Sequence, residues 1–382
     1  MPLLHQIKLE NILSFGPDTP ALQLNALNVL IGPNGSGKSN LVETILFLKC
    51  STFDLSISVR LSGGVRDWVW RGAKESQPSC LTVEISPLTP SQPSIYHQIS
   101  FEERNQQLYL LDESLIADKL LYDFDNGVSP LIKYANEEMR NIHPALLSRE
   151  KSVLSQIRDP EQFPELTHVW TQYDRIRVYR EWSFGRLNPA RFSQKADGRT
   201  DYLEPDCSNL GMVLNRIRRD PVQKEQLIER LNDLYPGIKD VDVSIEGGTV
   251  QVFLTEGKYA MPATRLSDGT LRYLCLLAIL LHPTPPPLIC IEEPELGLHP
   301  DVMPAIGKLL KDASTRTQLI VTTHSDELID SLSDSPEDVV VCEKHDGCTT
   351  FNRLDAEQLK VWLKDYSLGN LWRSGQIGGN RW

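Results

Sequence analysis

The chain has 382 residues, of which 24 per cent are charged, and its formal net charge is −12. A chain this acidic is not a general binder of polyanions, so any contact with nucleic acid must come from a local basic patch. The seven cysteines are odd in number and irregularly spaced, which excludes a disulfide framework and favours a reducing compartment. The first residues lack the pattern of a secretory signal, and the longest apolar run, near Leu271–Leu281, is too short to cross a bilayer. We therefore expect a cytoplasmic protein with no membrane contact.

Three short strands and a helix are predicted at the start of the chain. Residues Leu4–Leu9 alternate apolar and polar side chains, and a second short strand follows at Leu22–Leu24. Residues Leu27–Ile31 form a nearly apolar run, which is typical of a buried strand. After a glycine-rich turn, the apolar residues of Ser39–Lys49 recur at helical spacing.

The middle of the chain gives weaker signals. A proline- and serine-rich stretch, Ser86–Ser94, predicts a long surface loop or a hairpin connection. From about Asn105 to Tyr173 the pattern is polar and favours helix, so we expect a helical insertion or arm there. A further helix is predicted over Gln223–Leu234, and Gly247–Gly248 between two apolar runs predicts a β-hairpin.

The last third of the chain alternates strands with helices. Strands are expected at Leu288–Ile291, Leu319–Thr323 and Val339–Cys342, and helices at Leu271–Leu281 and Val302–Ala313. This alternation predicts an α/β fold with a mainly parallel core sheet flanked by helices, preceded by a mixed N-terminal sheet.

A phosphate-binding loop is the most specific motif in the sequence. Residues Gly32–Ser39 (GPNGSGKS) match G-x-x-x-x-G-K-[ST] between a predicted strand and a predicted helix, which is the context that the motif requires. Backbone N–H groups of such a turn can surround phosphates at the positive end of the helix. Lys38 would reach the β- and γ-phosphates, and Ser39 would hold Mg²⁺. The expected nucleotide contacts are Asn34, Gly35, Ser36, Gly37, Lys38, Ser39 and Asn40.

Polar residues follow two of the predicted buried strands. After Leu288–Ile291, Glu292 could hold Mg²⁺ through its waters and Glu293 could orient an attacking water. Without the phosphate loop, two carboxylates here would more simply mark a solvated turn. The strand Leu319–Thr323 is followed by His324, at the edge where α/β sheets bind ligands, and its imidazole could donate to a γ-phosphate.

The segment Leu266–Thr270 (LSDGT) precedes the most apolar predicted helix. A serine and a glycine at the start of a helix offer a hydroxyl and N–H donors to an anion. Ser267 or Asp268 would cap the helix in any case. The open question is whether a phosphate also docks at Ser267 and Gly269.

These four elements, in this order, resemble the ABC-type ATPases of the SMC, RecF and OLD group. The resemblance covers about residues 1–75 and 230–345, including the opening IKLENILSFG, and it is weaker in the middle. The matching motifs are Walker A (Gly32–Ser39), the signature (Leu266–Thr270), the Walker B acid and catalytic glutamate (Glu292, Glu293), the D-loop (Glu295–Pro300) and the switch histidine (His324). The resemblance implies an ATPase with catalytic Lys38, Glu293 and His324, ATP bound also at Ser267 and Gly269, and Mg²⁺ held by Ser39 and Glu292.

The resemblance also implies a division of the chain into four parts. Residues 1–104 would form the N-terminal part of the ATPase domain, and residues 105–222 a helical and basic insertion. Residues 223–350 would complete the ATPase domain, and residues 351–382 would form a C-terminal helix and tail.

Three departures from the family pattern affect the expected chemistry. Glu292 stands where most ABC proteins have Asp, and Asp268 stands where the signature usually has Gly. A carboxylate at position 268 would repel a γ-phosphate unless it points away or caps the helix. No glutamine occupies a convincing Q-loop context, although Gln77 and Gln98 are weak candidates. These departures leave open a protein that binds ATP without turning it over.

The resemblance implies a homodimer that forms on ATP binding. Lys38, Ser39, Glu292, Glu293 and His324 of one chain would face Ser267 and Gly269 of its partner across the nucleotide. Hydrolysis would remove the γ-phosphate and loosen the dimer.

Three outputs of such a cycle are open. The first is a DNA-linked or defence function, supported by Arg175–Arg219, where ten basic residues face five acidic ones with aromatic residues between them. Equally, those arginines could pair with the acids of the chain or reach the nucleotide. The second is a switch that controls a separate effector such as a nuclease, with Tyr366–Trp382 either docking that partner or packing on the core. The third, least supported, is the ATPase subunit of a transporter.

Overall fold

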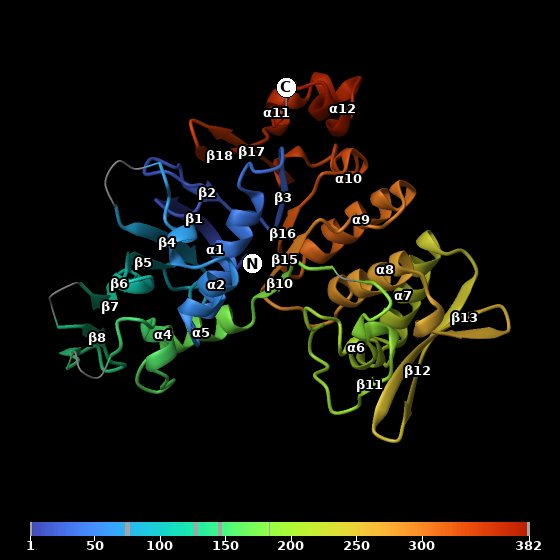
Figure 1. Cartoon of the computed structure of the whole chain (residues 1–382), viewed down its shortest axis with the longest axis horizontal. Helices are drawn as coiled ribbons and strands as arrows, with labels where there is room; N and C mark the ends of the chain where they lie inside the picture. Colours follow the sequence, from blue (N-terminus) through green and yellow to red (C-terminus); the bar gives the residue numbers. More distant parts are fainter. Residues whose placement is uncertain (1, 73–76, 126–128, 144–146, 183, 380–382) are drawn as a thin grey trace. The chain divides into compact units, whose positions relative to one another are not determined.

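The chain folds into two compact units (Figure 1), and each is described by itself. The computed structural model describes residues 2–72, 77–125, 129–143, 147–182 and 184–379. The first unit comprises residues 1–176, 340–354 and 377–382, and the second comprises residues 177–339 and 355–376.

The first unit contains an antiparallel sheet of eight strands in the order β2-β1-β4-β5-β6-β7-β8-β9. The strands are β1 (Leu4–Glu10), β2 (Leu22–Gln23), β4 (Ser79–Ile85), β5 (Ile95–Arg104), β6 (Gln107–Ile116), β7 (Leu120–Phe124), β8 (Leu131–Lys133) and β9 (Met139–Asn141). The loop predicted at Ser86–Ser94 is confirmed as the connection between β4 and β5. Alternate residues of β4 are buried, as expected for a strand with one face on the core.

This sheet corrects the helical insertion predicted from about Asn105 to Tyr173. Strands β6 to β9 occupy much of residues 107–141, and helix begins only at α4 (Val153–Gln156) and α5 (Pro164–Asp174). The leucines and Glu113 of β6 favour helix locally, but β6 pairs with β5 from Tyr96↔Ile116 to Arg104↔Gln107. Cross-strand packing of this length overrides weak helix propensity.

The remaining elements of the first unit surround the glycine-rich turn. They are β3 (Leu27–Ile31), α1 (Lys38–Cys50), α2 (Leu55–Leu61), α3 (Val65–Trp68), β17 (Val339–His345) and β18 (Cys348–Arg353). Strands β3, β17 and β18 are neighbours in that order. Helix α1 is fixed on the unit by Phe47, whose ring lies 5.1 Å from Trp68 and 5.4 Å from Phe101 of β5. The helix that follows the glycine-rich turn is therefore anchored in the core of this unit.

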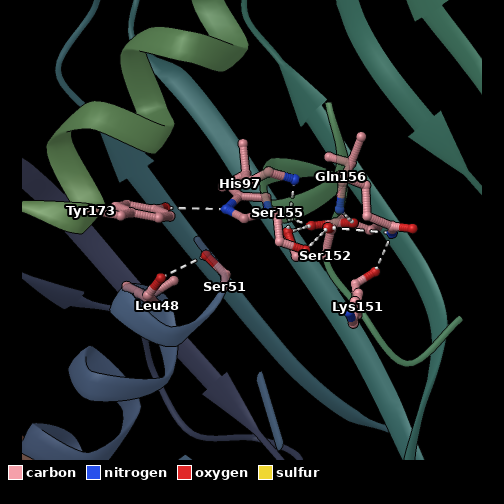
Figure 2. Close-up of polar contacts among 11 residues, drawn as sticks. Leu48, Ser51, His97, Lys151, Ser152, Ser155, Gln156 and Tyr173 are labelled. Carbon is pink, nitrogen blue, oxygen red and sulfur yellow. Dashed lines mark hydrogen bonds and ion pairs between the residues drawn. The ribbon is translucent and has the colours of Figure 1, made fainter. Parts of the chain in front are cut away.

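A buried polar network joins α4 and α5 to the antiparallel sheet. Figure 2 shows His97 of β5, whose Nδ1 lies 3.1 Å from the hydroxyl of Tyr173 in α5. The Nε2 atom of His97 lies 3.2 Å from Oε1 of Glu113 in β6. The same carboxylate accepts hydrogen bonds from the Ser152 hydroxyl and, at 2.8 Å, from the backbone N–H of Val153. One buried glutamate thus accepts from two donors at the start of α4 and pairs with His97 of β5.

Replacing Glu113 with alanine should lower the free energy of unfolding by about 3–5 kcal/mol, because buried donors of three residues lose their acceptor. Glu113→Gln keeps one acceptor oxygen, so we expect a smaller loss. Urea unfolding followed by circular dichroism measures both. A loss below about 1 kcal/mol for the alanine variant would contradict this role.

The second unit carries three parallel strands in the order β10-β15-β16. They are β10 (Arg177–Tyr179), β15 (Leu288–Glu292) and β16 (Gln318–Thr322). Its helices are α6 (Leu210–Ile217), α7 (Pro221–Leu234), α8 (Asp268–Leu280), α9 (Met303–Ser314), α10 (Asp326–Asp330), α11 (Ala356–Leu359) and α12 (Leu368–Arg373). All residues of β15 up to Ile291 and all of β16 are buried, as their apolar sequences predict.

A small antiparallel sheet completes the second unit. Its strands are β11 (Gln194–Lys195), β12 (Ile238–Glu246), β13 (Thr249–Glu256) and β14 (Tyr259–Pro262). The hairpin predicted around Gly247–Gly248 is confirmed as β12 and β13, and both glycines have positive φ, of 55° and 78°. Strand β14 was not predicted.

Residues 366–376 of the C-terminal segment pack within the second unit. Leu371 and Trp372 of α12 are buried, and the backbone N–H of Gly369 donates to Asp330 of α10 at 2.6 Å. This favours the packed alternative for this segment, while Trp382 lies outside the described residues. Among the described residues, no helix combines the length and apolarity needed to cross a membrane.

Candidate functional site

The glycine-rich turn has the backbone of a phosphate-binding loop. Gly32, Gly35 and Gly37 have φ of 143°, 79° and 102°, a region that side chains disfavour. A Cβ atom on Gly32 would lie 2.2 Å from the carbonyl oxygen of Cys342, whereas one on Gly35 would meet nothing within 4 Å. Gly35 therefore leaves an open approach to the loop, where a ligand can come close to the backbone.

The side chains of the turn divide into buried and exposed groups. Lys38 is buried, and its Nζ donates to the carbonyl oxygens of Gly32 at 2.8 Å and Pro33 at 3.0 Å. The hydroxyl oxygen of Ser36 is buried and has no hydrogen-bond partner among the described residues. Asn34 and Ser39 are exposed. A buried cation and an unsatisfied hydroxyl beside open backbone fit an anionic ligand such as a triphosphate.

Strand β18 braces the turn from the C-terminal part of the chain, a feature that the sequence did not reveal. Thr349 is fully buried, and its Oγ1 lies 3.0 Å from the carbonyl oxygen of Ser36 and 2.7 Å from Oγ of Ser14. Asn40, expected to contact nucleotide, directs its side-chain amide to Ser14 at 2.7 Å. Its side chain thus takes part in the hydrogen bonds that support the loop.

The two carboxylates stand at the carboxyl end of β15, and their environments differ. Glu292 accepts from Nε of Arg180 at 3.2 Å through Oε2, while its Oε1 is buried without a hydrogen-bond partner among the described residues. Its backbone oxygen accepts from Trp182 Nε1 at 2.8 Å. Arg180 thus holds the longer glutamate side chain in place and leaves one oxygen available. A buried oxygen of this kind suits a hard divalent cation.

Glu293 has a strained backbone and a side chain that is about one-third exposed. Its φ is 46°, and its N–H donates to the carbonyl oxygen of Thr322 in β16 at 2.9 Å. Its carbonyl oxygen accepts from Nη2 of Arg272 in α8 at 2.8 Å. Burial lowers the pKa of Arg272 to about 10, and its guanidinium lies 4.8 Å from the ring centre of Trp182. Non-glycine residues in this conformation cluster at functional sites, where the surroundings enforce the strain.

The structure brings His324 to Glu293, as expected of side chains that follow neighbouring parallel strands. Nε2 of His324 lies 3.8 Å from Oε1 of Glu293, and both side chains are about one-third exposed, at 31 and 37 per cent. Glu295 fixes this arrangement, since its Oε1 accepts from the backbone N–H of His324 at 2.7 Å and from the Thr323 hydroxyl at 2.8 Å. The sequence placed Glu295 only at the start of the D-loop and missed this contact.

Glu295 provides a pH-dependent test of this arrangement. Burial raises the pKa of its carboxyl group, so the folded chain favours the protonated form. The resulting stabilisation is complete below the pKa of the unfolded chain and is lost as the pH rises through the folded pKa. Glu295→Gln keeps an acceptor oxygen without the charge, so its free energy of unfolding relative to the original chain should rise between pH 5 and pH 8. Denaturant unfolding at both pH values measures this difference, and a constant difference would contradict it.

The segment Leu266–Thr270 opens α8 as predicted. Ser267 is the N-cap, and its hydroxyl accepts from the N–H of Thr270 at 3.0 Å. A Cβ atom on Gly269 would lie 3.0 Å from the carbonyl oxygen of Gly297, which explains the need for a very small residue. A hollow of about 620 Å³ lies beside this helix start, lined by Leu234, Tyr235, Leu254, Met261, Arg265, Leu266, Ser267, Gly269, Thr270, Gly297, Leu298 and His299. Both predicted contact residues, Ser267 and Gly269, line it.

The aromatic side chains of the basic stretch Arg175–Arg219 are mostly buried, whereas most of its basic residues are exposed. Tyr179, Phe184 and Tyr202 are buried, Trp182 stacks on Phe184 with ring centres 5.8 Å apart, and Phe192 is 46 per cent exposed. Among the described residues, arginines of the stretch form these ion pairs: Arg180 with Glu292, Arg191 with Asp268, Arg199 with Asp201, and Arg218 with Asp242. For these arginines the contacts support pairing within the chain.

Comparisons with known proteins agree with this geometry. A protein-family model described as "AAA domain, putative AbiEii toxin, Type IV TA system" matches residues 27–330. The sequence finds no match among curated proteins.

Solved structures with a similar fold are Smc head domains. One is the SmcHead bound to the C-winged helix domain of ScpA, with 13% identity, a TM-score of 0.61, and coverage of 94% of this chain and 100% of that chain. Another is the Smc head domain with an extended coiled coil bound to the C-terminal domain of ScpA from Pyrococcus furiosus. It has 13% identity, a TM-score of 0.59, and coverage of 96% of this chain and 99% of that chain. A third is the Smc head domain with a coiled coil and joint from Pyrococcus yayanosii. It has 11% identity, a TM-score of 0.54, and coverage of 96% of this chain and 99% of that chain. At these identities the likeness concerns the fold, which is that of an ABC-type P-loop ATPase.

Proposed function

The chain belongs to the AAA-domain family whose model it matches, and from this premise we propose that it is a Mg²⁺-dependent ATPase whose two copies join around ATP. The observation that carries the proposal is the grouping of Glu292, Glu293 and His324 at the ends of two paired parallel strands. They occur in a chain that also has a complete phosphate loop, and these are the parts that phosphoryl transfer to water requires.

The residues of the loop would bind and orient the triphosphate. Lys38 would exchange its two carbonyl acceptors, Gly32 and Pro33, for phosphate oxygens, and the backbone N–H groups from Gly35 to Ser39 would surround the phosphates. Ser39 and Glu292 would hold Mg²⁺, which when bound neutralises phosphate charge. The exposed hydroxyl of Ser39 and the unsatisfied Oε1 of Glu292 fit this donor set.

Glu293 and His324 would act on the attacking water and the γ-phosphate. Oε1 of Glu293 would accept a hydrogen bond from the water and orient it, and the imidazole of His324 would donate to a phosphate oxygen. Their separation of 3.8 Å places one acceptor and one donor at the same point of the strand edge. Ser267 and Gly269 of the partner copy would close the site, so that each γ-phosphate would join two chains.

The cycle has three candidate outputs: a DNA-linked function, a switch for a separate effector, and the ATPase subunit of a transporter. Base stacking on DNA through Arg175–Arg219 would need exposed aromatic residues, and of those described in this stretch Phe192 alone is strongly exposed. Phosphate contacts would need only exposed basic residues, which the stretch does have. A switch in which ATP-driven dimerisation controls a separate effector does not need this surface. The family description, which names a toxin–antitoxin system, also supports a defence function of this kind.

The test is to measure ATPase rate and oligomeric size, each with and without single-stranded and duplex DNA. As a switch of this kind, the protein should form dimers on Mg²⁺–ATP alone and change its rate less than about twofold with DNA. Stimulation by DNA that disappears as salt is raised would instead support the DNA-linked function.

A further inference from the structure

The first residue of α8, Asp268, poses an electrostatic problem for the proposed function. Its side chain is 63 per cent exposed and lies next to Ser267 and Gly269 at the helix N-terminus. An acid in the first turn of a helix is favourable by itself, because it offsets the positive end of the helix dipole. The same negative charge would repel an incoming phosphate at that end.

Arg191 lies against this carboxylate and is held in place by the backbone of two segments. Its Nη2 contacts Oδ1 of Asp268, and its Nη1 donates to the carbonyl oxygen of Leu266 at 2.6 Å. Its Nε donates to Gly185 at 3.3 Å, and Nη2 also approaches the carbonyl oxygen of Phe184 at 3.4 Å. The arginine side chain is only 10 per cent exposed. The guanidinium is therefore a fixed positive charge in contact with the start of α8.

We propose that Arg191 is the positioning residue that enables this helix start to accept a phosphate despite Asp268. This inference rests on the proposed function. Arg191 neutralises the carboxylate of Asp268 and directs it away from the ligand, so that Ser267 and Gly269 can contact the γ-phosphate held by a second copy. A planar guanidinium that binds a carboxylate and the Leu266 carbonyl together also fixes the backbone just before the helix. In this chain, Arg191 would thus offset the charge of the carboxylate at position 268.

The proposal predicts a specific non-additivity between the two residues. In a Glu293→Gln background, which keeps ATP bound, Arg191→Met should weaken the ATP-dependent dimer about ten- to a hundredfold at low salt. In chains that also carry Asp268→Asn, the same change should cost less than about threefold, because no charge remains to be neutralised. Raising the salt should reduce the first loss, since Asp268 is largely exposed. Sedimentation equilibrium with Mg²⁺–ATP measures the dimer dissociation constant in both backgrounds and at each salt concentration.

Equal losses in the two backgrounds would overturn the proposal, because Arg191 would then act only through the backbone carbonyls. Asp268→Asn with Arg191 intact is a second test. It removes the charge partner of Arg191 but keeps the arginine's backbone hydrogen bonds. It should change dimerisation less than about threefold, and a tightening of tenfold or more would show that Asp268 is not neutralised. ATP binding by the single chain should stay unchanged when Arg191 or Asp268 is replaced, because in this proposal the start of α8 meets the nucleotide of a second copy.

Arg218→Met is the matched control, since Arg218 pairs with the exposed Asp242 in the same unit and neither residue lines the hollow at the start of α8. It should leave the dimer unaffected, and a loss equal to that of Arg191→Met would count against the proposal. If the Glu293→Gln chain does not dimerise on Mg²⁺–ATP at all, the proposed function fails. If it dimerises and Arg191→Met has no effect, only this inference fails.

Discussion

Replacing Glu293 with glutamine should abolish ATP turnover and trap the ATP-bound dimer. Glutamine has the same shape and keeps the backbone hydrogen bonds to Thr322 and Arg272, so ATP binding should survive. Its amide cannot accept a hydrogen bond from the attacking water as strongly as a carboxylate does, so the water is not oriented. We therefore expect kcat to fall by a factor of about 10²–10⁴. Phosphate release under multiple turnover measures the rate, and sedimentation with Mg²⁺–ATP measures the dimer.

The matched control for this variant is Glu229→Gln, an exposed glutamate of α7 in the same unit. It removes the same charge far from the strand ends and should leave kcat within about twofold. Normal hydrolysis by the Glu293→Gln chain would show that the general base has been assigned wrongly. Loss of ATP binding in that chain would contradict a role confined to the water.

Lys38→Ala should have the second large effect, a loss of at least about a hundredfold in ATP affinity. The buried Nζ is a positive charge within the loop itself, and a charge-assisted bond to phosphate contributes far more than a neutral one. The substitution also removes a donor from the Gly32 and Pro33 carbonyls, so thermal unfolding must be measured beside affinity. Isothermal titration with Mg²⁺–ATP gives the affinity.

Lys8→Ala is the control for Lys38, because Lys8 lies in the same unit and forms an exposed pair with Glu10. ATP affinity should be unchanged in that variant. A folded Lys38→Ala chain that binds ATP as tightly as the original would exclude the glycine-rich turn as the phosphate site.

The sequence was most informative about the buried strands and least informative about the antiparallel sheet. Leu27–Ile31 was predicted with its observed bounds, because a strand covered on both faces leaves a continuous apolar run. Strand β6 contains Asp112 and Glu113 among leucines, and its burial does not alternate cleanly. Its conformation depends on pairing with β5 and β7, which no local pattern encodes.

The same distinction applies to the candidate site. Glu292, Glu293 and His324 were found because motif spacing and strand ends can be seen in the sequence. The residues that contact this site and the phosphate loop were harder to find: Arg180 and Arg272 contact the two glutamates from other segments, and Thr349 contacts the loop. For Arg180 and Arg191, the only sequence signal was a basic stretch with interspersed aromatics, which is also typical of a nucleic-acid surface. The burial of most of those aromatics supports a structural role for them, and no local pattern predicts that burial.

The most direct test of a site shared between two chains is complementation by two inactive variants. Lys38→Ala disables the phosphate loop, and Ser267→Arg blocks the start of α8; each variant alone should be inactive. A mixed dimer should contain one intact site, formed by Lys38 of one chain and Ser267 of the other. An equimolar mixture should therefore regain about one-quarter of the original ATPase rate if the chains pair at random. No recovery from folded chains that still form mixed dimers would contradict the shared site.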